Sequence, residues 1–125
     1  MIGSIIISLI IYQGSIDYKS STLTLDKETL EVSGSYGLKL AKKEIYKLEL
    51  VNELPPISYK AKGFAAGDYA KGSFKIKGGS TVKLFVNKKT SPFLLLRTSV
   101  GDIYYNTDES NMYTLNKKIT KWHES

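Results

Sequence analysis

The run Phe93-Leu94-Leu95-Leu96 predicts a β-strand in the middle of a sheet. Successive side chains of a strand point to opposite faces, so four consecutive apolar residues give this strand two apolar faces. Such a strand is buried only where the sheet is covered on both sides. Turns are predicted on either side of it, over residues 87–92 and 99–102. We therefore expect a central strand here and not an edge strand.

A β-hairpin is predicted just before this strand, and its register follows from the alternation of apolar residues. A two-residue turn at Gly78-Gly79 would pair Ile76 with Thr81 and Phe74 with Lys83, which mixes core residues with solvent-facing ones. A three-residue loop, Gly78-Gly79-Ser80, pairs Ile76 with Val82 and, next along, Phe74 with Leu84. Because a one-residue slip moves every side chain to the other face, we expect the three-residue loop.

Further strands are indicated by period-two alternation between glycine and proline breaks. The expected elements are a hairpin of 22–25 and 30–33 around the turn 26–28, strands at 38–40, 45–50, 57–62 and 103–106, and a glycine-rich connection at 63–72. In the strand 45–50 the pattern places Tyr46, Leu48 and Leu50 on one face. The chain is thus mainly β, with about seven strands.

The end of the chain changes to a helical period. Met112, Leu115, Ile119 and Trp122 are spaced by three or four residues, which places them on one face of a helix. Thr107 or Asp108 is the expected N-cap. One amphipathic helix therefore closes the domain.

Short strands followed by one C-terminal helix resemble the pleckstrin-homology (PH) superfold, and in particular bacterial PH-like domains of unassigned function that often follow a membrane-spanning segment. The similarity covers Leu23 to Trp122. It is carried by Gly34-Ser35-Tyr36-Gly37, Ile45, Leu48, Leu54-Pro55, Gly63, Gly72-Ser73-Phe74, Phe93-Leu94-Leu95-Leu96, Ile103, Asn106 and the final helix. The resemblance implies a bent antiparallel β-sandwich or barrel capped by the helix.

The resemblance does not extend to inositol-phosphate binding. PH domains that bind phosphoinositides carry several basic residues in the first hairpin loop. The corresponding loop here, Asp26-Lys27-Glu28-Thr29, has more acid than base. A shared fold does not in any case imply a shared function.

Catalytic and cofactor chemistry finds little support in this sequence of 125 residues. The absence of cysteine excludes disulfides and thiolate metal sites. The single histidine, His123, is expected to be frayed and exposed, and the carboxylate pair Asp108-Glu109 to serve the helix dipole. The segment 67–73 lacks the lysine placement and the following helix of a phosphate-binding loop. We expect a non-enzymatic protein without a cofactor or metal.

Positive charge is concentrated between Tyr59 and Arg97. The chain has a net charge of +6, and this stretch contains nine basic residues and one acid, Asp68. The predicted register sets Lys75 directly opposite Lys83, with Phe85 on the same outward face. Lysines on a solvent-exposed face are ordinary and also block aggregation, but opposed like charges are destabilising. An anionic partner would offset that repulsion.

The lysines expected to bind a partner are Lys75, Lys77, Lys83, Lys88 and Lys89. The expected partner is an anionic membrane surface or an acidic protein.

The apolar segment Met1–Tyr12 has three interpretations. At about a dozen residues it is shorter than the roughly 20 that span a membrane. It is the end of a transmembrane helix, a buried strand, or a hydrophobic arm that packs on a partner. We divide the chain into this apolar segment, 1–15, and a PH-like domain, 16–125. We expect a membrane-associated protein with a cytoplasmic domain, a soluble cytoplasmic protein being the alternative.

Three functions follow from these features. The first is a membrane-proximal binding module with a basic face. The second is a protein-interaction or oligomerisation domain that uses a strand edge or the N-terminal segment. The third is binding of single-stranded nucleic acid, which the sequence disfavours because Phe85 alone would supply stacking.

Overall fold

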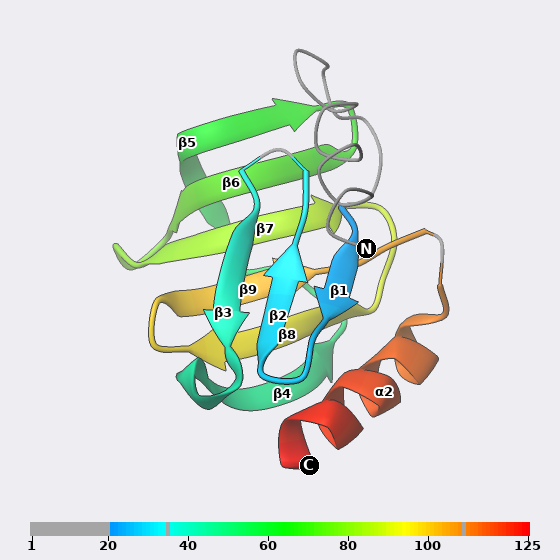
Figure 1. Cartoon of the computed structure of the whole chain (residues 1–125). Coiled ribbons are helices and arrows are strands. Elements are labelled where there is room, and N and C mark those ends of the chain that lie inside the picture. The colour runs from blue at the N-terminus through cyan, green and yellow to red at the C-terminus, as the bar shows by residue number, and fades with distance from the viewer. Residues whose placement is uncertain (1–20, 35, 109) are drawn as a thin grey trace.

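Two β-sheets and one α-helix form the part of the chain that the computed structural model describes, residues 21–34, 36–108 and 110–125 (Figure 1). The smaller sheet has the order β1 (Leu23–Leu25), β2 (Thr29–Val32), β3 (Leu38–Ala41). The larger sheet has the order β4 (Ile45–Val51), β8 (Phe93–Thr98), β9 (Gly101–Tyr105), β7 (Thr81–Asn87), β6 (Tyr69–Ile76), β5 (Ile57–Ala66). A 3-10 turn, Lys42–Glu44, joins the sheets, and α2 (Met112–Glu124) follows β9. The fold is mainly β, as predicted.

Strand β8 lies between β4 and β9 and is buried on both faces, which confirms the prediction for this run. Leu94 and Leu96 contribute to an inter-sheet core that lies between the larger sheet, the smaller sheet and α2. Phe93 and Leu95 contribute to a second core on the opposite face of the larger sheet. Both faces of the sheet therefore need a cover.

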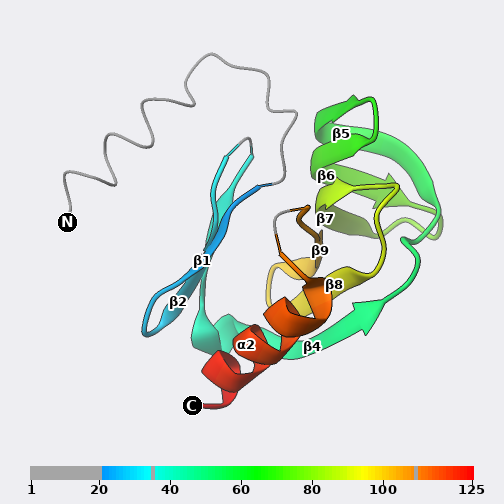
Figure 2. The same cartoon turned by 90° about the vertical axis from the view of Figure 1, so that its right-hand side faces the viewer.

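The two covers are of different kinds. On the inner face, the smaller sheet lies across the larger one (Figure 1) and supplies Leu30, Val32 and Leu40 to the inter-sheet core. On the other face, the larger sheet curves from β4 round to β5 (Figure 2), and Leu54 of the connecting loop packs on the second core. The larger sheet thus encloses the second core mainly with its own curvature.

The strand count and direction differ from the prediction of about seven antiparallel strands. The described residues form nine strands, and β7 pairs with β9 in parallel. The parallel pair arises because β8 is placed one position away from β7, and β9 returns into the gap between them. Strands β4 and β5 are the two ends of the sheet order, so the described strands form no closed barrel.

Asn106 stabilises the backbone where the parallel pair of β7 and β9 ends. Its side chain is buried; Oδ1 accepts from the Asn87 backbone N–H at 2.7 Å. Its Nδ2 donates to the Asn87 carbonyl at 2.9 Å and to the Thr90 carbonyl at 2.6 Å. One side chain therefore satisfies three backbone groups of the turn between β7 and β8, at the point where that turn passes the end of β9.

The register of the β6–β7 hairpin was predicted wrongly. Phe74 pairs with Val82, so Lys83 lies opposite Ser73 and not opposite Lys75. The hairpin turn is centred one residue earlier than predicted. The observed register differs from the predicted one by two residues, and such a slip leaves every side chain on the same face. Apolar alternation could not distinguish the two.

The segment predicted as a glycine-rich connection is instead the hairpin of β5 and β6. Gly63 and Gly72 are cross-strand partners in it. A Cβ on Gly72 would collide with the Lys62 carbonyl oxygen and the Gly63 Cα, and a Cβ on Gly63 would meet the Lys71 carbonyl oxygen. Both glycines have positive φ, 147° and 123°. The two backbones approach closely only because neither residue has a side chain.

Helix α2 joins both sheets, and its predicted apolar stripe is confirmed. Met112 and Ile119 are buried in the inter-sheet core, with Leu115 and Trp122 packed against it. The Trp122 Nε1 donates to the Asp26 carbonyl at 2.6 Å, in the β1–β2 turn. The helix therefore fixes the smaller sheet against the larger one.

The predicted N-cap of this helix was wrong. The cap is Asn111, whose Oδ1 accepts from the backbone N–H groups of Tyr113 and Thr114 at 2.9 and 3.1 Å. Thr107 and Asp108 precede it. In strand β4, a bulge between Ile45 and Lys47 leaves Tyr46 exposed, contrary to its predicted position beside Leu48.

Replacing Gly72 with alanine should lower the free energy of unfolding by about 2 to 4 kcal/mol, because the methyl group collides with backbone and φ is unfavourable. Gly67→Ala is the matched control, since Gly67 has positive φ but nothing within 4 Å of the added Cβ; it should cost about 1 kcal/mol. Urea unfolding measures both. Equal losses would show that the close approach to Gly63 is unimportant.

Asn106→Leu should lower the free energy of unfolding by about 3 kcal/mol or more, because three backbone groups lose their partners. Asn111→Ala, which removes only an exposed cap, should cost about 1 kcal/mol. Chemical unfolding of the two variants compares them directly. A loss for Asn106→Leu no larger than for Asn111→Ala would show that the hydrogen bonds of Asn106 to Asn87 and Thr90 are not important for stability.

Candidate functional site

Three adjacent strands carry positive charge without any acid. Strands β5, β6 and β7 contain five lysines and no aspartate or glutamate. The lysines are Lys60, Lys62, Lys71, Lys75 and Lys83. Four of these lysines reach the surface, whereas Lys71 is buried.

One face of these strands is turned toward the smaller sheet. Lys62 and Lys83 both pair with Ser73, and Lys71 pairs with Phe85. Directly paired residues share a face, and Phe85 lies in the inter-sheet core. The side chains of Lys62, Ser73 and Lys83 therefore belong to the inner face, beside the end of that core, and Lys71 is buried on the same face.

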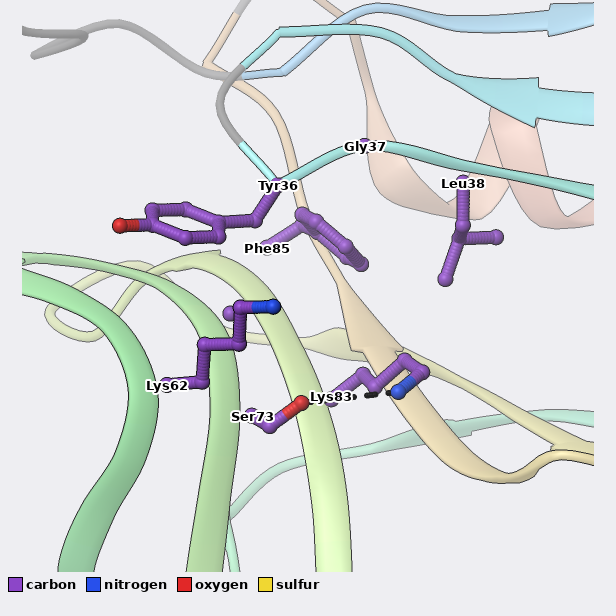
Figure 3. Close-up of a pocket in the computed structure, with 8 residues that line it drawn as sticks. Tyr36, Gly37, Leu38, Lys62, Ser73, Lys83 and Phe85 are labelled. Atoms are coloured by element: carbon purple, nitrogen blue, oxygen red, sulfur yellow. Dashed lines mark hydrogen bonds between the residues drawn. The ribbon is translucent and has the colours of Figure 1, made fainter.

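A cleft of about 260 Å³ opens at this place, between the β2–β3 turn and strands β5–β7 (Figure 3). Its lining residues are Tyr36, Gly37, Leu38, Lys62, Gly72, Ser73, Lys83 and Phe85. The turn and β3 form one wall, which is largely apolar, and the lysines and Ser73 form the other. The cleft thus has an apolar side and a cationic side.

Two ammonium groups lie in the cleft. In Figure 3 the Lys62 side chain points into the space below the rings of Tyr36 and Phe85, and Lys83 turns back toward Ser73. The Lys83 Nζ donates to Ser73 Oγ at 3.5 Å. Neither lysine forms an ion pair with a carboxylate of the described residues. Their charge is therefore open to an external anion.

Three carboxylates of the larger sheet and its turns form ion pairs with other residues. Asp68 pairs with Lys89 at 3.7 Å. Arg97 Nε pairs with Glu49 at 3.3 Å and its Nη1 pairs with Asp102 at 3.2 Å. These residues lie on β4, β8 and β9, at the opposite end of the larger sheet from β5 and β6. Arg97, the last residue of the basic stretch, is thus compensated, whereas the two lysines of the cleft are not.

The five lysines predicted to bind a partner are not brought together on one face. Lys75 and Lys77 lie at the β6–β7 turn, where Lys75 Nζ donates to the Gly79 carbonyl at 3.3 Å. Lys88 and Lys89 follow the other end of β7, about 20 Å away for a strand of this length. Only Lys83 lines the cleft.

Phe85 was predicted to face outward among the lysines and is instead 1% exposed in the inter-sheet core. The smaller sheet covers this face at Phe85 and leaves it open at Lys83. Period-two alternation identifies a face but does not say which part of it another sheet will cover.

Lys62, Ser73 and Tyr36 also line the cleft but were not singled out from the sequence. The pairing of Lys62 with Ser73 could have been predicted, because a two-residue hairpin turn at Gly67-Asp68 places these residues opposite each other. That hairpin was interpreted as a connection, so the pairing was lost. Tyr36 reaches the cleft only because the two sheets meet.

The groups weighed for catalysis have structural contacts. His123 was predicted to be frayed and exposed, but it is half-buried with Nε2 at 2.6 Å from the Ile45 carbonyl. Because a carbonyl only accepts, Nε2 donates.

Asp108 lies outside the helix and accepts from the Tyr69 hydroxyl at 2.8 Å, which raises the pKa of Tyr69. Glu109 lies outside the described residues. In the described ranges no three His, Cys, Asp or Glu side chains are grouped as a metal site.

Comparisons with protein-family models, curated proteins and solved structures found no match. Among the described residues, no helix combines the length and apolarity that a membrane crossing requires. The predicted apolar segment Met1–Tyr12 lies outside those residues.

Proposed function

We propose that this chain is a non-enzymatic, PH-like binding module that attaches reversibly to an anionic membrane surface. The observation that carries the proposal is the concentration of four lysines that reach the surface, without an acid, on β5, β6 and β7. The cytoplasmic leaflet is the anionic one, so the proposal places the domain on the cytoplasmic side.

The surface best suited to a bilayer is the edge of the larger sheet where β5 begins and β6 ends. We call this surface the basic edge and define it by Ile57, Tyr59, Lys60, Lys75 and Lys77. Tyr59 pairs with Lys75, and the Lys77 N–H donates to the Pro56 carbonyl at 3.1 Å, so these residues are neighbours. Tyr59 is 58% exposed and Ile57 is 36% exposed. Aromatic and apolar side chains beside lysines suit the headgroup region.

The expected affinity of the basic edge is modest. Each lysine near an anionic leaflet contributes about 1 kcal/mol, so three contribute about 3 kcal/mol, and burial of Tyr59 and Ile57 adds to this. Attachment at this strength is reversible and depends on salt, because exposed charges are screened.

Strand addition by a protein partner along β5 is less well supported. Two irregularities interrupt its pairing with β6, one between Ile57 and Tyr59 and one between Lys60 and Lys62. Bulges and lysines are the devices by which edge strands avoid pairing with other chains. An acidic protein that binds side chains, without adding a strand, is the second candidate.

Replacing Lys60 and Lys77 with glutamine should weaken binding to vesicles that contain phosphatidylserine by about 30-fold, because two lysines contribute about 2 kcal/mol. The control is Lys117→Gln with Lys118→Gln, two exposed lysines of α2 with the same change in net charge. Sedimentation with phosphatidylserine vesicles and with neutral phosphatidylcholine vesicles measures the difference.

The full chain should pellet with the anionic vesicles and much less with the neutral ones. Equal pelleting with both would overturn the proposal. An equal loss in the α2 control would also overturn the assignment to the basic edge, since binding would then follow net charge alone.

A further inference from the structure

We infer that the cleft between the β2–β3 turn and strands β5–β7 binds a single phosphate monoester group. The inference rests on the proposed function in that the ligand is anionic. It differs in naming a discrete site, on the inner face of the sheet, that is separate from the basic edge. Lys62, Lys83 and Ser73 would be its polar contacts.

The charge of the cleft matches a phosphate monoester better than it matches a singly charged anion. Lys62 and Lys83 both line it and have no described carboxylate as a partner. A phosphate monoester carries a charge of about −1.5 to −2 near neutral pH. A carboxylate or a phosphate diester carries a single negative charge and would leave one lysine uncompensated.

The donors match the oxygens of the same group. A monoester has three terminal oxygens that are strong acceptors. The Ser73 hydroxyl accepts from Lys83 Nζ, so its own proton is free to donate toward the cleft. Two ammonium groups and one hydroxyl therefore give the cleft as many donor groups as the monoester has terminal oxygens. Lysine is suited to this task as a point charge, without the fixed geometry of arginine.

The size and the walls of the cleft limit the organic group that the phosphate can carry. The volume of about 260 Å³ lies just below the range of about 300 to 1,000 Å³ found for drug-sized ligands. Leu38 and the ring of Phe85 form the apolar part of the cleft. Gly72 adds no side chain to the floor. The cleft therefore suits a phosphate with a short carbon moiety.

Titration of the full chain with glycerol phosphate, monitored by amide NMR, tests this. The N–H signals of Gly37, Gly72 and Ser73 should shift. Methyl sulfate and dimethyl phosphate, which carry a single negative charge, should bind at least tenfold more weakly. Affinity should rise from pH 5.5 to pH 7.5, because the second pKa of a monoester is about 6. The single histidine, His123, lies against the Ile45 carbonyl and not in the cleft, so the ligand is the group that titrates.

Lys62→Gln with Lys83→Gln should weaken glycerol phosphate binding by about 100-fold, tenfold for each charged hydrogen-bonding group. Lys60→Gln with Lys77→Gln, the basic-edge pair, is the matched control and should change it by less than about twofold. Ser73→Ala, a smaller change to the site, should weaken binding several-fold. The dispersion of the NMR spectrum reports that each variant is folded.

Vesicles distinguish a lipid from a soluble ligand. If the source is a lipid, vesicles with phosphatidic acid, a monoester, should pellet the chain more than phosphatidylserine vesicles of equal surface charge. The Lys62→Gln, Lys83→Gln variant should remove that preference. If the source is soluble, glycerol phosphate binds and the two vesicles pellet the chain equally. Both results support the cleft as a monoester site.

The inference is overturned if glycerol phosphate causes no shift, if methyl sulfate binds as tightly, or if the Lys62→Gln, Lys83→Gln variant binds unchanged. Its failure is separable from that of the proposed function. If the chain pellets with phosphatidylserine vesicles but does not prefer a monoester, the membrane-binding proposal stands and the cleft inference is rejected. If the chain binds glycerol phosphate but pellets with no vesicle, the reverse holds.

Discussion

The burial of β8 on both faces is the constraint on which the remaining structure depends. Leu94 and Leu96 need a cover on one side of the sheet, and Phe93 and Leu95 need one on the other. The smaller sheet and α2 provide the first cover. The curvature of the larger sheet (Figure 2) and the loop between β4 and β5 provide the second. Apolar burial is the dominant favourable term in folding, so both covers follow from the composition of this one strand.

The same arrangement produces the cleft. Along the inner face of the larger sheet, the side chains are apolar at β8 and β9 and become cationic at β5 and β6. Phe85 is the last apolar residue before this change, and Lys83 and Ser73 lie beyond it. The β2–β3 turn extends past the inter-sheet core and so faces lysines in place of leucines. An open space remains there because charged side chains resist burial without partners.

Much of the secondary structure could be predicted because its signals are local. The helix stripe of Met112 and Ile119 and the hairpin that pairs Leu23 with Val32 are examples. The errors arose where two arrangements satisfy the same local pattern. A two-residue slip hid the true partner of Lys83, and glycines at 63 and 72 indicated a loop although they permit a close strand pair. Of the three residues Lys62, Ser73 and Lys83 that line the cleft, only Lys83 was therefore singled out from the sequence.

The sequence by itself determined that the chain is mainly β, that residues 93–96 are central, that one amphipathic helix closes the domain, and that positive charge is concentrated between Tyr59 and Arg97. These properties depend on composition and on periods of two and 3.6 residues. Only the tertiary structure decided which lysines meet, that β7 and β9 are parallel, and that Tyr36 faces Lys62 across a cleft. Those relations join residues distant in the chain, and they follow from how the two sheets cover β8.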